Sequence, residues 1–419
     1  MNRITLTGAT RRPRRDTILV GGSALLLAAL VPSFASCADT EQGLDPSADG
    51  SVTLGEASTD AGSDADADVQ VDSGCVPSDP NCVTTELSCD EAAWCPVPTT
   101  VSTRYALTSV WGSGPSDIWA VGSGGTIVHY DGKAWKQTPP APNTYNTFRA
   151  VWGSGPNDVW VVSMTDLILH GTGYANGAAT WTIVPGPGAQ LPEQRAATAI
   201  WGTGPDDVRI AFRPRSLFIG SEFLTVNQWV KSAKPGGGDA TWSLGKGEGS
   251  IHAFWGSAND LWYVADNSET NGWQRAMTVH GTPGATGEME WTLVESQSTQ
   301  RLEGIWGSGP NDIWAVGDNG TIRHLTNGAS RWDIVASPTM EALHGIWGSG
   351  PNDVWAVGDN GTILHFDGTS WKSSTAAFPI GKKPRLAAVW GSGPNDVWIV
   401  GDAVSLHYTG PKPGMQESE

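Results

Sequence analysis

The amino-acid sequence predicts an all-β protein, a seven-bladed β-propeller of four-stranded antiparallel blades that is closed by an N-terminal strand. A unit resembling Trp-Gly-Ser-Gly-Pro-Asn-Asp-Val-Trp recurs seven times at intervals of 41 to 54 residues, which is the period of propeller blades. Each unit divides into short strand-like segments separated by turn signals. The 419 residues include 53 Gly and 22 Trp but only 16% charged residues, a composition that suits short strands and tight turns.

One copy of the unit, from Leu343 to Trp371, shows the expected blade most clearly. Strands one to three are predicted over residues 343–347, 353–357 and 362–366, and strand four begins at Trp371. The Asp-Asn-Gly sequence at 359–361 predicts a tight connection between strands two and three, because Asn and Gly accept positive φ at low cost. The strand-one tryptophans of the seven units are Trp111, Trp152, Trp201, Trp255, Trp306, Trp347 and Trp390.

The first 36 residues are predicted to be a signal peptide. Four arginines within residues 11–15 precede an apolar run over 18–31, which is too short to span a membrane comfortably. Phe34-Ala35-Ser36-Cys37 resembles a bacterial lipobox, so Cys37 is expected to be lipidated and to become the first residue of the mature chain. Ordinary cleavage nearby, with release of an unanchored protein, is the alternative.

Residues 37–74 are expected to form a disordered acidic tether behind the lipidated cysteine. No Lys or Arg occurs from 38 to 99, and a segment of low hydrophobicity with unopposed negative charge does not fold. A second disordered segment is predicted over 411–419. The net charge of −18 argues against a nucleic-acid partner and against electrostatic docking on anionic lipids, which leaves the lipid anchor as the membrane contact.

A disulfide-rich segment is predicted over residues 75–91. In an exported chain, the four cysteines Cys75, Cys82, Cys89 and Cys95 are expected to form two disulfides, and the sequence leaves all three pairings open. A zinc site is disfavoured because the segment has no CxxC pair and no nearby His. No metal or other cofactor is predicted.

The propeller is predicted over residues 92–410, with its seam closed by the segment around Trp94. The seventh unit ends after residues 407–410 without a fourth strand. Trp94 precedes Trp111 by 17 residues, the same interval that separates Trp135 from Trp152. We therefore expect the Trp94 segment to be the outer strand of blade seven, where it removes an exposed edge and the nearby disulfides fasten the seam.

Two positions repeat in almost every unit and are interpreted as structural. One holds Asp in all seven units: Asp117, Asp158, Asp207, Asp260, Asp312, Asp353 and Asp396. The other holds His in six: His129, His170, His280, His324, His365 and His407. A repeated residue serves the blade itself, so these groups are expected to satisfy one another and the strand-two Trp by hydrogen bonds.

Positions that vary between the units are the better candidates for function. Three residues before each strand-one Trp lies a variable residue: Thr108, Arg149, Thr198, His252, Glu303, His344 and Ala387. If strand one is innermost, these residues surround the channel mouth, where Arg149, His252, Glu303 and His344 are candidates to bind a polar or anionic ligand. Candidate residues on the same face, in the connections between strands two and three, are Asp318, Asn319, Asp359, Asn360 and Asp402. Solvated strand starts are the alternative interpretation.

The Asp-Gly turns before two strand-four tryptophans, at residues 131–135 and 367–371, resemble those of the Asp-box (neuraminidase-repeat) propellers of bacterial extracytoplasmic proteins. The resemblance implies the fold and an extracytoplasmic lipoprotein, but both turns lack the Ser or Thr two residues before the Asp. It implies no sialidase activity, because that chemistry needs an arginine triad and Arg149 is the one suitable arginine in the variable positions.

These observations predict a monomeric, non-catalytic binding or scaffold propeller that is displayed on the cell envelope and recognises a protein, peptide or glycan. The expected location is the outer membrane, or the medium if the lipobox is not used. The alternative function is a polysaccharide hydrolase or lyase in which Glu303 and either His252 or His344 act as acid and base.

Overall fold

The computed structural model describes residues 75, 78–140, 144–186, 196–213, 215–219, 222–226, 228–232, 242–246, 249–266, 276–285, 289–326 and 328–412. The predicted signal peptide, Cys37, the tether and residues 413–419 lie outside these residues, so the expectations for them stay predictions. Among the described residues, the helical segments are single 3₁₀ turns, and none of them is long and apolar enough to cross a membrane.

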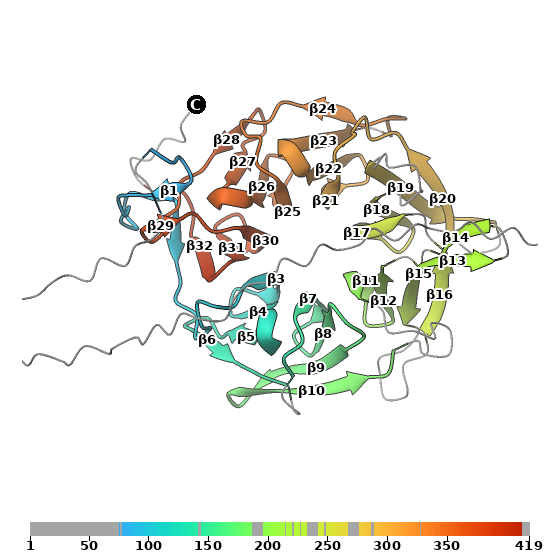
Figure 1. Ribbon diagram of the computed structural model, residues 1–419, viewed down its shortest axis with the longest axis horizontal. Helices are drawn as coiled ribbons and strands as arrows, with labels where there is room; N and C mark the ends of the chain where they lie inside the picture. Colours follow the sequence, from blue (N-terminus) through green and yellow to red (C-terminus); the bar gives the residue numbers. More distant parts are fainter. Residues whose placement is uncertain are drawn as a thin grey trace, which may run out of the picture. The chain divides into compact units, whose positions relative to one another are not determined.

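The described residues form seven four-stranded antiparallel sheets arranged in a ring, which confirms the predicted all-β propeller (Figure 1). The first three blades consist, from the centre outward, of β3 (Leu107–Gly114), β4 (Asp117–Gly122), β5 (Ile127–Tyr130) and β6 (Trp135–Gln137); β7 (Phe148–Gly155), β8 (Asp158–Ser163), β9 (Ile168–Ala175) and β10 (Ala178–Val184); and β11 (Ala197–Gly204), β12 (Asp207–Phe212), β15 (Gln228–Ser232) and β16 (Trp242–Lys246).

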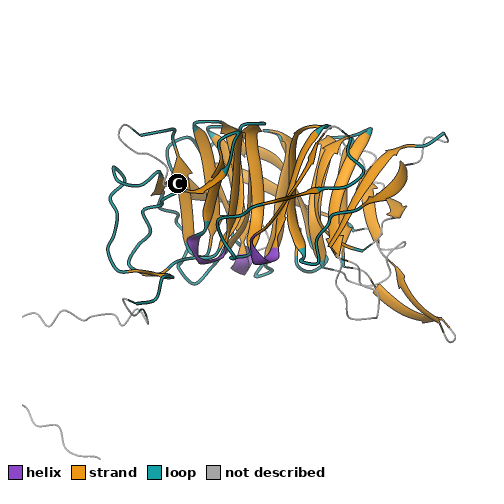
Figure 2. Ribbon diagram, turned by 90° about the horizontal axis from the view of Figure 1, so that it is seen from above, coloured by secondary structure: helices purple, strands orange, loops and turns teal. Residues whose placement is uncertain are grey.

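The next three blades follow the same order. They consist of β17 (Ser250–Ser257), β18 (Asp260–Asp266), β19 (Ala276–Pro283) and β20 (Met289–Val294); β21 (Leu302–Gly309), β22 (Asp312–Gly317), β23 (Thr321–Thr326) and β24 (Asp333–Val335); and β25 (Leu343–Gly350), β26 (Asp353–Gly358), β27 (Ile363–Phe366) and β28 (Trp371–Ser373). In blade three, the chain between β12 and β15 forms a separate hairpin of β13 (Arg215–Ile219) and β14 (Glu222–Val226), which projects from the ring (Figure 2).

The seventh blade is completed by the N-terminal segment, as the sequence predicts. Its strands are β30 (Leu386–Gly393), β31 (Asp396–Gly401), β32 (Val404–Tyr408) and β2 (Trp94–Pro96). In the seam, Trp94 lies opposite Tyr408 and Cys95 lies opposite His407. The Trp94 side chain is fully buried and contacts the ring of Trp355 in blade six edge-on, with centroids 5.0 Å apart.

The repeated Trp-Gly pair explains how neighbouring blades pack. A Cβ atom at Gly348 would lie only 2.6 Å from Cη2 of Trp306 in the preceding blade, so the glycine leaves the space that this indole fills. Gly112 accepts Trp390 across the seam in the same way. The core accordingly consists of clusters between adjacent blades rather than of one central core, and side chains on both faces of the second strands are buried.

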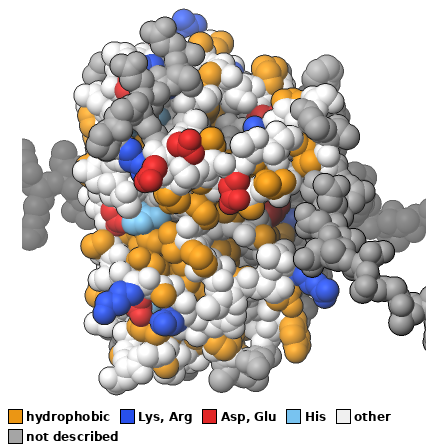
Figure 3. Space-filling view, turned by 90° about the vertical axis from the view of Figure 1, so that its left-hand side faces the viewer, with side chains coloured by type: hydrophobic (Ala, Val, Ile, Leu, Met, Phe, Trp, Pro, Cys, Tyr) orange, Lys and Arg blue, Asp and Glu red, His pale blue; other side chains and the backbone are white. Residues whose placement is uncertain are grey.

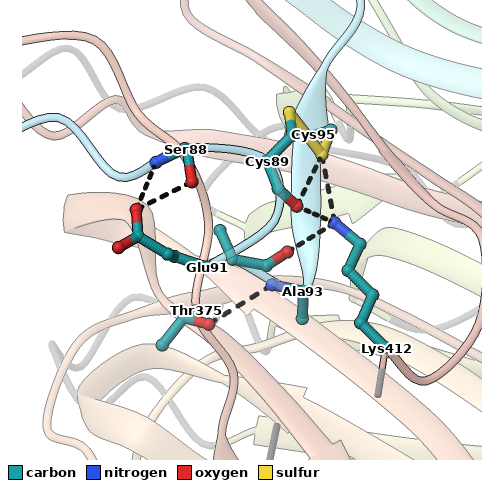
Figure 4. Close-up of a disulfide and its surroundings, with 8 residues drawn as sticks. Ser88, Cys89, Glu91, Ala93, Cys95, Thr375 and Lys412 are labelled. Carbon is teal, nitrogen blue, oxygen red and sulfur yellow. Dashed lines mark hydrogen bonds between the residues drawn. A yellow bond between two sulfur atoms is a disulfide. The ribbon is translucent and has the colours of Figure 1, made fainter. Parts of the chain in front are cut away.

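The four described cysteines form the disulfides Cys75–Cys82 and Cys89–Cys95. Of the three pairings that the sequence left open, this is the one in which each cysteine bonds to its neighbour along the chain. Both disulfides close short loops within the N-terminal segment, so neither links the two ends of the chain across the seam as a covalent staple. Instead, the Lys412 ammonium donates hydrogen bonds to the carbonyl oxygens of Cys89 and Ala92 (Figure 4). The seam is therefore held by the strand pairing and by this lysine.

The N-terminal segment also pairs with the chain between blades six and seven. Strand β1 (Cys82–Val83) pairs with β29 (Gly381–Lys382), and the Lys383 ammonium donates to the carbonyl oxygen of Pro80 over 2.9 Å. A groove of about 400 Å³ lies between the segment and blade six. Figure 3 views this side of the molecule, where hydrophobic side chains gather between acidic and basic ones.

Candidate functional site: the channel mouth

Strand register brings the variable strand-one positions and the connections between strands two and three to one face. Leu343 at the start of β25 pairs with Gly358 at the end of β26, directly before the turn η3 (Asp359–Gly361). The same pairing places the turns η1 (Ser123–Gly125) and η2 (Asp318–Gly320) beside the starts of β3 and β21. Figure 2 shows the three turns together on one face of the ring. The backbone therefore places the variable strand-one positions and the connections between strands two and three on one face, as the sequence predicts.

A cavity of about 230 Å³ lies where the seven innermost strands begin, and we call it the channel mouth. All seven variable positions line it, and one further charged residue, Arg385, joins them. The lining at these positions is Thr108, Arg149, Thr198, His252, Glu303, His344, Arg385 and Ala387. The structure thus brings the candidate residues Arg149, His252, Glu303 and His344 into a single cavity.

A chain of charged groups crosses blades four and five at the channel mouth. His252 Nε2 lies 2.9 Å from Oδ2 of Asp266, and the same carboxylate oxygen lies 2.9 Å from Nε of Arg301. Arg301 also donates from Nη1 to Oε1 of Glu303 over 3.2 Å. Burial acts to lower the pKa of Arg301, but Asp266 and Glu303 outweigh it, so the pKa is raised and the guanidinium is firmly charged.

A second group of charges occupies blades six and seven. His344 Nε2 lies 2.8 Å from Oδ1 of Asp359, and the guanidinium Nε of Arg385 lies 3.6 Å from the same oxygen. Beside it, Asn360 donates from Nδ2 to Oε2 of Glu341 over 2.9 Å. Each histidine of the channel mouth therefore has a carboxylate partner, and neither is paired with Glu303.

Arg149 differs from the other charged residues of the channel mouth. Its Nε donates to the carbonyl oxygen of Thr198 over 3.4 Å, and among the described residues no carboxylate lies within ion-pair distance of it. Burial lowers the pKa of Arg149; Glu303 opposes this shift, and the nearby positive charges of Arg385 and other arginines add to it. The site thus holds a half-buried guanidinium whose charge the protein does not fully neutralise, which favours binding of an anionic group.

The five candidate residues in the turns do not line the cavity. Asn319 and Asn360 have φ values of 58° and 52°, so each supplies the left-handed conformation that its turn requires. Asp402 is exposed, and its backbone N–H donates to the carbonyl oxygen of Arg385. The charge of Glu303, which lines the cavity, acts on Asp318: burial and this charge together raise the pKa of Asp318. Of the five, Asp359 alone forms a side-chain ion pair with a described residue that lines the cavity.

Sequence reasoning missed Arg301, Arg385 and Asp266. The two arginines occupy a second variable position, five residues before the strand-one Trp, where the other units carry only uncharged residues. That contrast was available in the sequence as a signal. Asp266 ends β18 four residues after the strand-two Trp262, the same offset that Asp318, Asp359 and Asp402 have in their units, so this signal was also present in the sequence.

The repeated Asp and His residues are hydrogen-bonded to each other in the six blades that carry both, as the sequence predicts. The strand-two Trp joins this cluster in four of those blades, whereas the buried indole nitrogens of Trp314 and Trp355 have no hydrogen-bond partner among the described residues. In blade one, Oδ1 of Asp117 accepts hydrogen bonds from the Trp119 indole over 3.1 Å and from the His129 ring over 2.7 Å. A partner that we did not predict, the Ser113 hydroxyl, donates to Oδ2 over 2.5 Å. Burial acts to raise the pKa of Asp117, but the hydrogen bonds from His129 and Ser113 outweigh it and hold the pKa below its usual range.

Blade three keeps this cluster with different chemistry. Arg209 replaces the strand-two Trp, is almost fully buried, and donates from Nε and Nη2 to the two oxygens of Asp207 over 2.9 and 3.1 Å. The Asn227 side chain, which stands where the other units have His, lies outside the described residues. The carboxylate therefore needs buried donors, and a guanidinium supplies them as well as an indole does.

The turn that resembles an Asp-box is also structural. Oδ1 of Asp367 accepts from the backbone N–H groups of Thr369 and Ser370 over 2.9 and 3.0 Å. Hydrogen bonds from Thr369 and Ser370 lower the pKa of Asp367 far below its usual range. The carboxylate thus fixes the turn before Trp371, and it is not among the described residues that line the channel mouth.

The chain resembles solved propeller structures, whereas no family model and no curated protein sequence matches it. YCF48 from Cyanidioschyzon merolae aligns with a TM-score of 0.57 at 18% identity, covering 76% of this chain and 99% of that one. YCF48 bound to D1 peptide aligns with a TM-score of 0.56 at 19% identity, covering 78% and 100%. U3-55K aligns with a TM-score of 0.55 at 8% identity, covering 75% and 98%. At these identities the likeness shows that the chain has the propeller fold.

Proposed function

We propose that this chain is a non-catalytic binding propeller that recognises a protein or peptide at the channel mouth. The observation that carries the proposal is Arg149, a half-buried guanidinium that has no carboxylate partner among the described residues, in a cavity that all seven blades line. An acidic side chain or a terminal carboxylate of a partner would supply the missing counter-charge. The structure of YCF48 with a D1 peptide is consistent with this use, because there a propeller of similar fold binds a peptide.

The pairing of the other charges favours binding over acid–base chemistry. Glu303 is engaged by Arg301, and both His252 and His344 are engaged by aspartates. A hydrolase would need an acid and a base facing one substrate bond across the cavity. Paired charges instead form a fixed pattern of donors and acceptors around Arg149, which suits the orientation of a bound polar segment.

Peptide selection tests this function directly. Peptides are selected from a random display library on the immobilised protein, and the best peptide is measured by calorimetry with the wild type, Arg149→Gln and Arg331→Gln. Arg331 is an exposed arginine outside the channel mouth and serves as the matched control. Removal of one partner of a desolvated charge pair should weaken binding by at least about 30-fold in Arg149→Gln, while Arg331→Gln stays within about twofold of the wild type. Equal affinities for all three proteins would contradict the proposal.

Display on the cell envelope is a separate part of the proposal. It is supported by the lipobox-like segment before Cys37 and by two disulfides, which persist in oxidising compartments. The full-length protein should fractionate with membranes, and Cys37→Ala should move it to the soluble fraction. Membrane association that survives Cys37→Ala would show that the protein is held there by other means.

A further inference from the structure

A second groove, of about 390 Å³, lies beside blade one and shares no lining residue with the channel mouth. None of the described residues that line it is charged, although the chain has a net charge of −18. The lining residues that carry hydroxyls are Thr100, Ser102, Tyr105, Thr126, Thr144 and Tyr145. We propose that this groove binds a neutral saccharide, a function additional to recognition at the channel mouth.

Two tyrosines provide flat surfaces in the groove. The ring of Tyr105 lies directly on Gly124, where a Cβ atom would come within 2.5 Å of Cε1 and where φ is +65°. The ring is therefore held against the η1 turn by a glycine, and 39% of the residue remains exposed. Tyr145 is 85% exposed, an unusual degree for a large aromatic residue. An aromatic ring with an apolar face and a polar hydroxyl suits a pyranose, which has an apolar face and polar edges.

The polar groups of the groove are mainly hydroxyls. Six of the twelve lining residues are Ser, Thr or Tyr. Ser102 Oγ and Thr144 Oγ1 accept backbone hydrogen bonds from Arg104 and Asn146, so each keeps its own proton to donate. Hydroxyls both donate and accept, which matches the hydroxyls of a sugar. A phosphorylated or carboxylated ligand would find no counter-charge among these residues.

The backbone around the groove is already fixed. Gln137 donates from Nε2 to the carbonyl oxygen of Thr100 over 2.6 Å, and the N–H of Gly125 donates to the carbonyl oxygen of Asn146 over 3.0 Å. These contacts hold the two sides of the groove in place. They also engage one Nε2–H of Gln137 and the N–H of Gly125, so the polar groups left to a ligand are mainly hydroxyls, which both donate and accept. A proline-rich peptide segment offers mainly carbonyl acceptors, whereas a saccharide offers both donors and acceptors and can use both capacities. The saccharide is therefore the better match.

Saturation-transfer NMR and calorimetry with three uncharged hexasaccharides, cellohexaose, chitohexaose and maltohexaose, test the proposal on the mature protein. At least one should bind. Tyr105→Ala and Tyr145→Ala should each weaken that binding by about 5- to 10-fold through loss of a stacking surface. Tyr145→Phe keeps the ring and should stay within about twofold. Met340→Ala, which truncates an exposed side chain elsewhere, should bind like the wild type.

The channel mouth and the groove are distinguished by Arg149→Gln, which should lose peptide binding and keep saccharide binding. Because Tyr145 is exposed, its variants should fold, and their thermal unfolding verifies this. The proposal is overturned if none of the three hexasaccharides binds, or if their binding is indifferent to both tyrosine variants. It is also overturned if a proline decamer binds in their place and is lost in Tyr145→Ala.

Discussion

Aspartates in the repeated clusters inside the blades and aspartates beside the channel mouth have pKa values that are shifted in opposite directions. Asp117 in a blade accepts hydrogen bonds from three side chains, and its pKa is lowered. At Asp318, beside the channel mouth, burial together with the charge of Glu303 raises the pKa. The comparison teaches that repetition identifies polar groups whose partners are built into the fold. Groups that the fold leaves incompletely compensated, such as Arg149, occur where the repeat varies.

The largest effect is expected from the seam, where a repeated residue is supplied by the other end of the chain. Trp94→Ala removes a fully buried indole that packs on Trp355 and Tyr408, so the free energy of unfolding should fall by about 3–5 kcal/mol. Trp291→Ala, at the equivalent position of blade four, removes a half-buried indole and should cost less. Chemical denaturation measures both. Equal losses would mean that the seam has no special weight in stability.

The contrast between the two kinds of aspartate can be tested by two matched substitutions. Asp353→Ala leaves His365 and Ser349 without their shared acceptor and should lower the free energy of unfolding by about 2–3 kcal/mol. Asp318→Ala removes a carboxylate whose ionised form the folded state disfavours, so stability should stay the same or rise. A greater loss for Asp318→Ala than for Asp353→Ala would break the comparison.

Acid should destabilise the protein through the repeated aspartates, each contributing a part of the total. The pKa values of Asp117, Asp158, Asp353 and Asp396 lie below the ordinary value of 3.8. Between the folded and unfolded pKa values, the unfolded state binds more protons than the folded state. The stabilisation from these aspartates is therefore complete above pH 3.8 and is lost as the pH falls through their folded-state pKa values. Thermal unfolding followed from pH 6 to pH 2 should show this decline, and Asp353→Ala should show a shallower one. An unchanged slope in that variant would argue against the assignment.

The smallest effect on stability is expected at the channel mouth. Arg149→Gln removes a cation that burial disfavours, so the free energy of unfolding should change by no more than about 0.5 kcal/mol, or rise slightly. The same variant carries the predicted loss of peptide binding. A large fall in stability would show that Arg149 is a structural residue like Asp117, and the distinction between the two regions would fail.

Much of the fold was predictable because each blade repeats the same local signals. The period, the turn residues and the tryptophan spacing identified the blades, and the 17-residue interval before Trp111 identified the closing strand. Ser113 and its equivalents were missed as partners of the repeated aspartates, because a Ser in a Gly-rich turn has an adequate local explanation. The sequential disulfide pairing was one of three possibilities, since Cys spacing alone does not say which side chains meet.

The candidate site was predictable only in part, for a related reason. The strand-one position that holds Arg149 and Glu303 was identified by its variation, and the structure places it in one cavity. The partners of these residues were not identified. Asp266 reaches the channel mouth from the end of strand two in blade four and pairs with Arg301 of blade five. Arg385 reaches it from the position before β30. Such contacts between blades depend on how the blades are arranged around the axis.

The sequence by itself determined the number of blades, the strand that closes the ring and the residues that repeat for structural reasons, because these depend on local signals and on spacing along the chain. The tertiary structure alone decided which charges are paired, that Arg149 has no carboxylate partner among the described residues, and that Tyr105 and Tyr145 line one uncharged groove. Pairing and burial depend on distances between segments that lie far apart in the chain, and such distances exist only once the ring is closed.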